Sequence, residues 1–412
     1  MSDMCKYSIP TAMAALLVTA TVPALSAEAT DFSSMVSEGT AKVDLRYRFE
    51  GVDEDGKDED GEAHTLRSRL TLESATYKGF SFLGEFDDVT HLGDDDFNDT
   101  DNGKTDYPIV ADPEGTAINQ AWLRYAWNDL SGTYGRQRIL HGNQRFIGGV
   151  AWRQNEQTFD GFRAHWQGGP GLSVDYAYVY KVNRIFGPDD TLAQPGDYST
   201  DDHFFKVDWS MTENHTVSAF AYLLDIDEAE GYGTAKSVDN STDTYGLDYA
   251  GKIGPVSLKA TYATQENAGG STLDYEADYY LAEAGMTLLG IKVTTGYEVL
   301  GSDNNVGFKT PYATAHKFQG WADKFLTTPE DGIEDAYLGL TGKLGPVKLG
   351  AFFHDFQAED SSDDFGSEID LVATWPVNDW LTTQLKFASF DTDDEDLYTD
   401  TDKLWVTAQV KL

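Results

Sequence analysis

Arginine residues are the clearest candidates for chemistry in this sequence of 412 residues. All eleven lie between Arg46 and Arg184. Arg46 and Arg48 stand two positions apart, as do Arg67 and Arg69, so each pair would lie on one face of an extended strand. A guanidinium holds a carboxylate or phosphate through two parallel hydrogen bonds, and rings of Arg or Lys select anions in pores. The spacing therefore predicts a surface that binds anions.

The segments that carry these residues alternate in polarity with a period of two. The alternation covers residues 42–50, 66–73, 172–181, 256–262 and 403–412. One face of each segment is apolar and the opposite face is polar, which is typical of strands in an outer-membrane barrel. The last of these segments reaches the end of the chain, so we expect the chain to end inside a strand.

The connections between these segments alternate between short turns and long acidic loops. The segments 253–255 and 344–346 are similar, and they represent either an internal repeat or one tight turn used twice. No run of eighteen or more apolar residues follows residue 29, which excludes a helical membrane protein. We therefore predict an all-β fold: a transmembrane antiparallel β-barrel of about eighteen strands, with short periplasmic turns and long acidic extracellular loops.

The N-terminus resembles a secretory signal peptide. Lys6 precedes an apolar stretch, and small residues follow it. We expect a signal peptide over 1–27, with cleavage possible as late as residue 29, a periplasmic lead over 28–40 and the barrel over 41–412. The single cysteine, Cys5, lies inside the peptide, so the mature chain has no thiol for a disulfide or a metal site.

The formal net charge of −40 comes mainly from loops. The segments 51–62, 88–116 and 391–402 contain 7, 9 and 7 acidic residues. These loops are either a solvated surface or a site where divalent ions bridge to lipopolysaccharide. Such a charge gives no indication of a nucleic-acid partner. The expected partners are outer-membrane lipid and lipopolysaccharide, the barrel assembly machinery, and an anionic saccharide or small-anion substrate.

Basic residues on the polar face of the strands would line the lumen. The predicted lumen or anion-binding residues are Arg46, Arg48, Arg67, Arg69, Arg124, Arg136, Arg138, Arg163 and Lys181. Acidic residues share the same face, so there are two interpretations. Either the arginines bind anions, or they pair with acids on neighbouring strands and brace the wall.

The longest loop, residues 301–334, is less acidic than the others. We identify Lys309, Lys317, Trp321 and Lys324 as its candidate functional residues, and we expect a short helix near 313–325. The loop would either enter the mouth as a constriction or pack as a lid on the outer rim.

Catalytic motifs are missing from the sequence. It contains no His-Glu-x-x-His, no Gly-x-Ser-x-Gly and no phosphate-binding loop. The adjacent residues His354 and Asp355 are more typical of a contact at the rim than of a hydrolase. We therefore expect no enzymatic activity, no catalytic residues, no cofactor and no metal site.

Several short motifs resemble the alginate-export family of outer-membrane porins. They are Leu45-Arg46-Tyr47-Arg48, Thr65-Leu66-Arg67-Ser68-Arg69, Gly135-Arg136-Gln137-Arg138, the segment 152–160 and the segment 317–325. The resemblance implies an eighteen-stranded barrel whose arginine-rich lumen is anion-selective and passes a polyuronate. It carries over to the six arginines in the first three motifs. This chain differs in having no arginine after Arg184 and in having more acidic outer loops.

These observations predict a channel in the bacterial outer membrane that passes anionic solutes. The substrate that we expect first is alginate or a related acidic oligosaccharide or polysaccharide. The alternative is a non-conducting or general-diffusion structural barrel whose acidic loops bind divalent ions, lipopolysaccharide or partners. The alternation also predicts which side chains face lipid. We expect this of Val43, Tyr47, Leu70, Tyr178, Val406 and Leu412.

Overall fold

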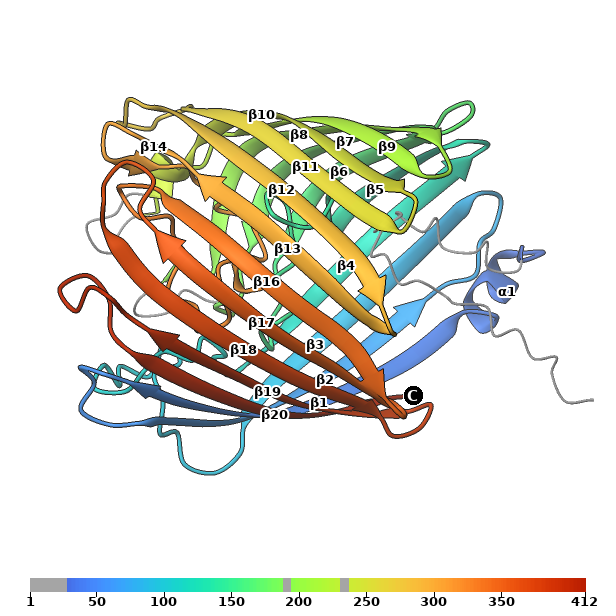
Figure 1. The fold of residues 1–412 in the computed structure, drawn as a ribbon. Helices are drawn as coiled ribbons and strands as arrows, with labels where there is room; N and C mark the ends of the chain where they lie inside the picture. Colours follow the sequence, from blue (N-terminus) through green and yellow to red (C-terminus); the bar gives the residue numbers. More distant parts are fainter. Residues whose placement is uncertain (1–27, 188–193, 230–236) are drawn as a thin grey trace, which may run out of the picture.

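The protein is a closed β-barrel (Figure 1). The computed structural model describes residues 28–187, 194–229 and 237–412, and the predicted signal peptide lies outside them. Within the described residues, 18 antiparallel strands form one sheet. The sheet closes where β1 (Thr40–Glu54) pairs with β20 (Thr401–Lys411), so every wall strand has two neighbours. The predicted fold and strand number are therefore confirmed.

Each wall strand is joined in antiparallel order to the next one along the chain. Between β1 and β20, the wall consists of β2 (Gly61–Glu73), β3 (Phe80–His91), β4 (Gly115–Trp127), β5 (Leu130–Gln137), β6 (Thr158–Gln167), β7 (Leu172–Asn183), β8 (Asp197–Thr212), β9 (His215–Leu224), β10 (Thr242–Ile253), β11 (Val256–Asn267), β12 (Glu276–Leu288), β13 (Ile291–Leu300), β16 (Ile333–Leu344), β17 (Val347–Gln357), β18 (Asp364–Pro376) and β19 (Leu381–Asp391). The connections contain a small hairpin, β14 (Ser302–Asp303) with β15 (Val306–Gly307), and two short 3-10 turns, η1 (Ser237–Asn240) and η2 (Ala315–Lys317).

Short turns lie at one end of the barrel and long loops at the other, which we call the short-turn end and the long-loop end. Gly254 and Gly345 each occupy the first position of a two-residue turn, with φ of 58° and 60°. Glycine adopts this left-handed conformation without a steric penalty, and it is favoured at that position of tight hairpins. The two similar segments are thus one turn type used twice.

The short N-terminal helix α1 (Phe32–Ser37) lies at the short-turn end, beside the β2–β3 connection. Asp31 caps it, because its side chain accepts from the backbone N–H of Ser34. Backbone hydrogen bonds of 2.7 Å from Ala29 to Thr76 and 2.9 Å from Ala75 to Met35 tie this lead to the barrel. Among the described residues, no helix is long and apolar enough to cross a membrane.

The wall alternates between an apolar outer face and a polar inner face. Leu70, Val406 and Leu412 are 40%, 42% and 70% exposed on the outside. Val43, Tyr47 and Tyr178 are partly exposed in the same phase of their strands, while intervening residues such as Arg46 are buried inside. The six residues predicted to face outward therefore do so.

Placing a charge on this outer face tests the assignment. Val406 lies in the middle of β20, so the substitution Val406→Arg should cost about 2–4 kcal/mol of folding free energy in a bilayer. Val406→Leu serves as the control. Equal denaturant midpoints for the two variants, measured by urea titration in liposomes, would show that position 406 does not face lipid.

Candidate channel constriction

Two of the long connections enter the barrel. We call residues 138–157, between β5 and β6, inner loop 1, and residues 301–332, between β13 and β16, inner loop 2. They bind each other through backbone hydrogen bonds, from Gly148 to Tyr312 at 2.8 Å and from Thr314 to Gln144 at 3.0 Å. The two loops therefore form one unit inside the wall.

Inner loop 1 crosses the interior from one side to the other. At one end Arg145 Nε lies 3.1 Å from Glu298 Oε1 on β13. At the other end Arg153 Nη1 lies 3.1 Å from Glu50 Oε2 on β1. All four residues are at most 6% exposed, and a buried charge without a partner is costly. These ion pairs hold the loop across the lumen.

An aromatic side chain joins the two loops beside the wall strands β1, β19 and β20. Trp152 of inner loop 1 stacks on His316 of inner loop 2, with ring centroids 4.0 Å apart and an interplanar angle of 11°. The Arg48 guanidinium lies 4.2 Å from the Trp152 ring centroid, and Lys386 Nζ lies 3.9 Å from it. A cation over an indole face is attracted by the ring quadrupole, and more strongly when both are desolvated.

Inner loop 2 is fixed by a buried carboxylate. Asp323 contacts Arg153 Nη2 and Lys403 Nζ, both at 3.2 Å, and His316 Nδ1 at 2.6 Å. Burial would raise the pKa of Asp323, but the neighbouring His316, Lys403 and Arg153 hold that pKa well below its ordinary value. Asp323 is therefore ionised and links the two loops to β20.

The imidazole of His316 is held in its neutral form. Its Nδ1 faces Asp323, and its Nε2 lies 2.6 Å from Lys386 Nζ, which donates to it. Burial, together with Lys386, lowers the pKa of His316 well below its ordinary value, although Asp323 opposes the shift. A proton on Nε2 would replace this hydrogen bond with two facing cations.

Acid should therefore loosen the loops. Released His316 takes up a proton below about pH 6.5, whereas packed His316 does not, so falling pH favours release of inner loop 2. We expect larger current fluctuations in single-channel recordings as the pH falls through this value. His316→Gln should abolish the pH response, while His91→Gln, at the long-loop end, should keep it. An unchanged response in His316→Gln would contradict this mechanism.

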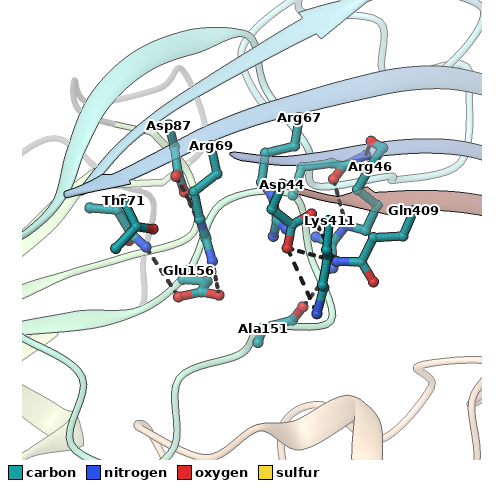
Figure 2. A network of polar contacts seen from close by, with 12 residues as sticks. Asp44, Arg46, Arg67, Arg69, Thr71, Asp87, Ala151, Glu156, Gln409 and Lys411 are labelled. Atoms are coloured by element: carbon teal, nitrogen blue, oxygen red, sulfur yellow. Dashed lines mark hydrogen bonds and ion pairs between the residues drawn. The ribbon is translucent and has the colours of Figure 1, made fainter. Parts of the chain in front are cut away.

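The arginines predicted to line the lumen differ in the number of carboxylates that they contact. In a first group the positive charge is neutralised by neighbouring carboxylates, and Figure 2 shows Arg69 of this group. Arg69 donates to Asp87 at 2.6 Å and to Glu156 at 2.7 Å. Arg138 contacts Glu156 and Glu85, both at 2.5 Å. Burial would raise the pKa of Glu156, but Arg138 and Arg69 hold it well below its ordinary value.

A second group, Arg46, Arg48 and Arg67, has fewer counter-charges. Arg67 lies 3.2 Å from Asp44; both side chains are labelled in Figure 2. The other two rely on weaker or neutral partners, since Arg48 is 3.9 Å from Asp112 and Arg46 donates to the neutral Gln154 at 2.9 Å. Asp112 is shared with a further arginine of inner loop 1. This wall of β1 and β2 therefore has an excess of positive charge, covered by inner loop 1.

Arg124 and Arg163 lie on neighbouring positions of the inner wall, on either side of Thr133. Arg163 is paired with Asp175, at 2.8 Å. In the part of the chain that the structure describes, Arg124 has no ion-pair partner, and its Nη2 donates to Ser131 at 3.2 Å.

Two predicted lumen residues lie out of phase with the others. Arg136 pairs in register with the exposed Ala121, and Lys181 with the exposed Ser199, so both take the outward phase. A register shift between Val179 and Lys181 changes the phase of β7 at that position. The register therefore differs from the predicted phase at both residues, and at Lys181 the reason is the bulge, which simple alternation does not show. Both residues still line a cavity together with Asn155 and Glu156 of inner loop 1.

The four candidates in inner loop 2 are dispersed. Lys324 bonds to Glu54 at 3.0 Å, and Lys317 donates to the backbone oxygen of Asn143 at 2.9 Å. The Trp321 ring lies 3.7 Å from the ammonium of Lys386. Lys309 lies in a cavity at the long-loop end.

The local structure of inner loop 2 also differs from the prediction. The short helix expected near 313–325 is absent, and only the turn η2 forms in that described segment. Of the two positions considered, the structure has the loop inside the barrel instead of on its rim, because its groups bind inner loop 1 and wall residues such as Glu368.

Sequence reasoning missed inner loop 1 as a structural element. Its residues Trp152, Arg153, Gln154 and Glu156 make many of the contacts at the constriction. A signal was present, because 138–157 is a long connection with one acidic residue and three arginines, unlike the acidic outer loops. A connection that must lie inside a polar lumen needs such a composition.

Comparison with known proteins agrees with this architecture. A family model described as alginate export matches residues 40–314. No curated protein matches the chain.

Solved structures resemble almost the whole chain. OccAB4 of Acinetobacter baumannii has a TM-score of 0.69 at 12% identity, covering 91% of this chain and 98% of that chain. OccK3 (OpdO) of Pseudomonas aeruginosa has a TM-score of 0.67 at 13% identity, covering 92% and 97%. OccK8 (OprE) of the same organism has a TM-score of 0.67 at 12% identity, covering 92% and 99%. At these identities the likeness establishes a shared fold.

Proposed function

The chain belongs to the alginate-export family, and from this membership we propose that it is a channel for anionic solutes, with alginate or a related acidic oligosaccharide as substrate. Its fold and family are those of porins of the bacterial outer membrane. Porins are transport proteins and not enzymes. The substrate passes the constriction formed by inner loops 1 and 2. The long-loop end faces the exterior and the short-turn end faces the periplasm.

One observation carries the preference for anions. Arg46, Arg48 and Arg67 lie on adjoining strands, and their ladder partners place Arg46 directly opposite Arg67. These three positive charges are in contact with only two carboxylates, those of Asp44 and Asp112. They lie in an interior where a low dielectric strengthens electrostatic interactions. Such a wall lowers the energy of an anion in the lumen and raises that of a cation.

A second candidate function has an observation of its own. The two inner loops bind each other inside the barrel, and Arg48 and Arg67 on the wall are each only 2% exposed. A barrel plugged in this way would be a non-conducting structural protein whose acidic loops bind divalent ions, lipopolysaccharide or partners. This candidate predicts no stable conductance.

Planar-bilayer recording separates the two functions. We expect the purified barrel to give discrete openings, a reversal potential shifted toward that of chloride in a potassium chloride gradient, and block by added oligouronate. A neutral oligosaccharide of equal length is the control and should block less. A cation preference would contradict the anion proposal, and the absence of stable openings would favour the plugged barrel.

A further inference from the structure

A cavity of about 310 Å³ opens at the long-loop end, beside inner loop 2. It lies between the hairpin β14–β15, the turn η1 and the β11–β12 connection. Its volume is at the lower end of the range for small-ligand sites. The lining residues that matter here are Asn240, Leu273, Lys309, Pro311, Leu326 and Glu330.

The backbone of Lys309 is held in place from the barrel wall. Its N–H donates to Gln265 Oε1 at 2.7 Å, and Gln265 Nε2 donates to its carbonyl at 2.8 Å. Gln265 on β11 is 1% exposed and is itself fixed by Thr244 and Tyr275, at 2.8 and 2.9 Å. The backbone position from which the Lys309 side chain extends is therefore fixed before any ligand binds, which lowers the entropy cost of binding.

The ammonium group of Lys309 lacks the carboxylate partner that most other lysines near the lumen have among the described residues. Lys259 and Lys324 each have a carboxylate at 3.0 Å, on Glu283 and Glu54. Among the described residues, no carboxylate lies within ion-pairing distance of Lys309. Burial lowers the pKa of Lys309, with Asp239 opposing the shift from a distance. An anion that entered the cavity would gain an unpaired, partly desolvated charge as its partner.

The remaining lining matches a sugar acid. Glu330 and Asn240 offer acceptors and donors for hydroxyl groups, and Leu273, Pro311 and Leu326 offer apolar surface for a ring face. A simple inorganic anion would use Lys309 and would leave the apolar surface unused. A neutral sugar would use the apolar surface and would leave Lys309 unpaired.

We propose that this cavity is a capture subsite for one or two uronate residues at the long-loop mouth, with the carboxylate on Lys309 Nζ. The proposal rests on the proposed function, because the ligand belongs to the substrate class proposed there, and it adds the site where that ligand is first held. The subsite holds the acidic saccharide at the mouth, away from the constriction formed by Trp152 and its neighbours.

Calorimetry on the detergent-solubilised barrel tests the subsite directly. The probes are a diuronate and a neutral disaccharide of matched linkage. We expect the diuronate to bind more tightly, and Lys309→Gln to weaken it by about tenfold, as the loss of a charge-assisted hydrogen bond implies. Lys309→Arg should retain most of the affinity. Lys57→Gln is the matched control, since Lys57 lies in an exposed outer loop and donates to a backbone oxygen of Thr105 at 3.3 Å.

The outcomes separate this subsite from the channel proposal. Equal diuronate affinity in wild type and Lys309→Gln, or equal affinity for the neutral disaccharide, would overturn the subsite. Chloride preference in wild-type bilayer recordings would stand in either case, because it depends on Arg46, Arg48 and Arg67. Conversely, a barrel that binds diuronate through Lys309 but prefers cations would overturn the channel proposal and leave the subsite intact.

Discussion

Removal of residues 143–151 and their replacement by a short glycine linker is expected to raise single-channel conductance severalfold. This segment forms most of the part of inner loop 1 that crosses the lumen, and it includes Arg145, whose Nε lies 3.1 Å from Glu298. The deletion also removes Gly148 and Gln144, which bind inner loop 2, so inner loop 1 should leave the pathway, while inner loop 2 keeps its contacts to the wall through Asp323 and Glu368. Arg138 and Glu156 remain and keep their ion pairs with the wall.

The matched control shortens the exposed acidic loop at residues 393–396, which joins β19 to β20. Its conductance should stay close to that of wild type. Both variants must retain the heat-modifiable electrophoretic shift of a folded barrel. An intact deletion variant with wild-type conductance would contradict the view that the inner loops set the width of the pathway. If only the deletion variant conducts, the plugged-barrel function is supported instead.

The combined substitution Arg48→Gln and Arg67→Gln should reverse or abolish the anion preference. Two positive charges leave this region while its acids, Asp44, Glu50 and Asp112, stay, so the local field changes sign. The effect does not require contact with the permeating ion, because a buried charge acts through a poorly screening interior. Block by oligouronate should weaken by about tenfold or more, as expected from the loss of hydrogen bonds to charged groups.

Arg136→Gln is the control for this second result, because it removes the same charge from a residue that is already paired with Asp160, at 2.8 Å. Its reversal potential should match wild type. Arg48→Lys covers a possible packing defect, since it retains the charge beneath Trp152 while losing the planar guanidinium. A double Gln variant with wild-type selectivity and block would establish that Arg48 and Arg67 only brace the barrel and its inner loop.

The same arginine type therefore has different roles at different positions. Arg69 is held by Asp87 and Glu156, so it cross-links the wall to inner loop 1. Arg48 lies on the neighbouring strand with its nearest carboxylate at 3.9 Å and a tryptophan ring against its face. The two interpretations of the arginines, bracing and anion binding, apply to different members of the set.

The barrel was predictable from sequence because alternation is a local property. The alternation within each strand indicates which residues face lipid, as Leu70 and Val406 illustrate. Closure of the barrel follows because strands in a membrane cannot leave an unpaired edge. Tight turns such as the one at Gly254 are local as well, since a positive φ selects glycine. Alternation failed at Lys181, where one extra residue in β7 shifted the phase.

The constriction was decided by tertiary structure. Nothing in the spacing of Arg48 indicates that the ring of Trp152, more than a hundred positions later in the chain, lies against its guanidinium. Nor does it indicate that His316 stacks on the same Trp152 ring. Whether a lumen arginine has a free charge depends on which acid a folded loop brings to it, and Glu156 reaches Arg69 only because inner loop 1 turns inward. The sequence alone thus determined the wall and its polar lining, while the position of two loops, held by long-range buried ion pairs, determined which of those charges the lumen retains.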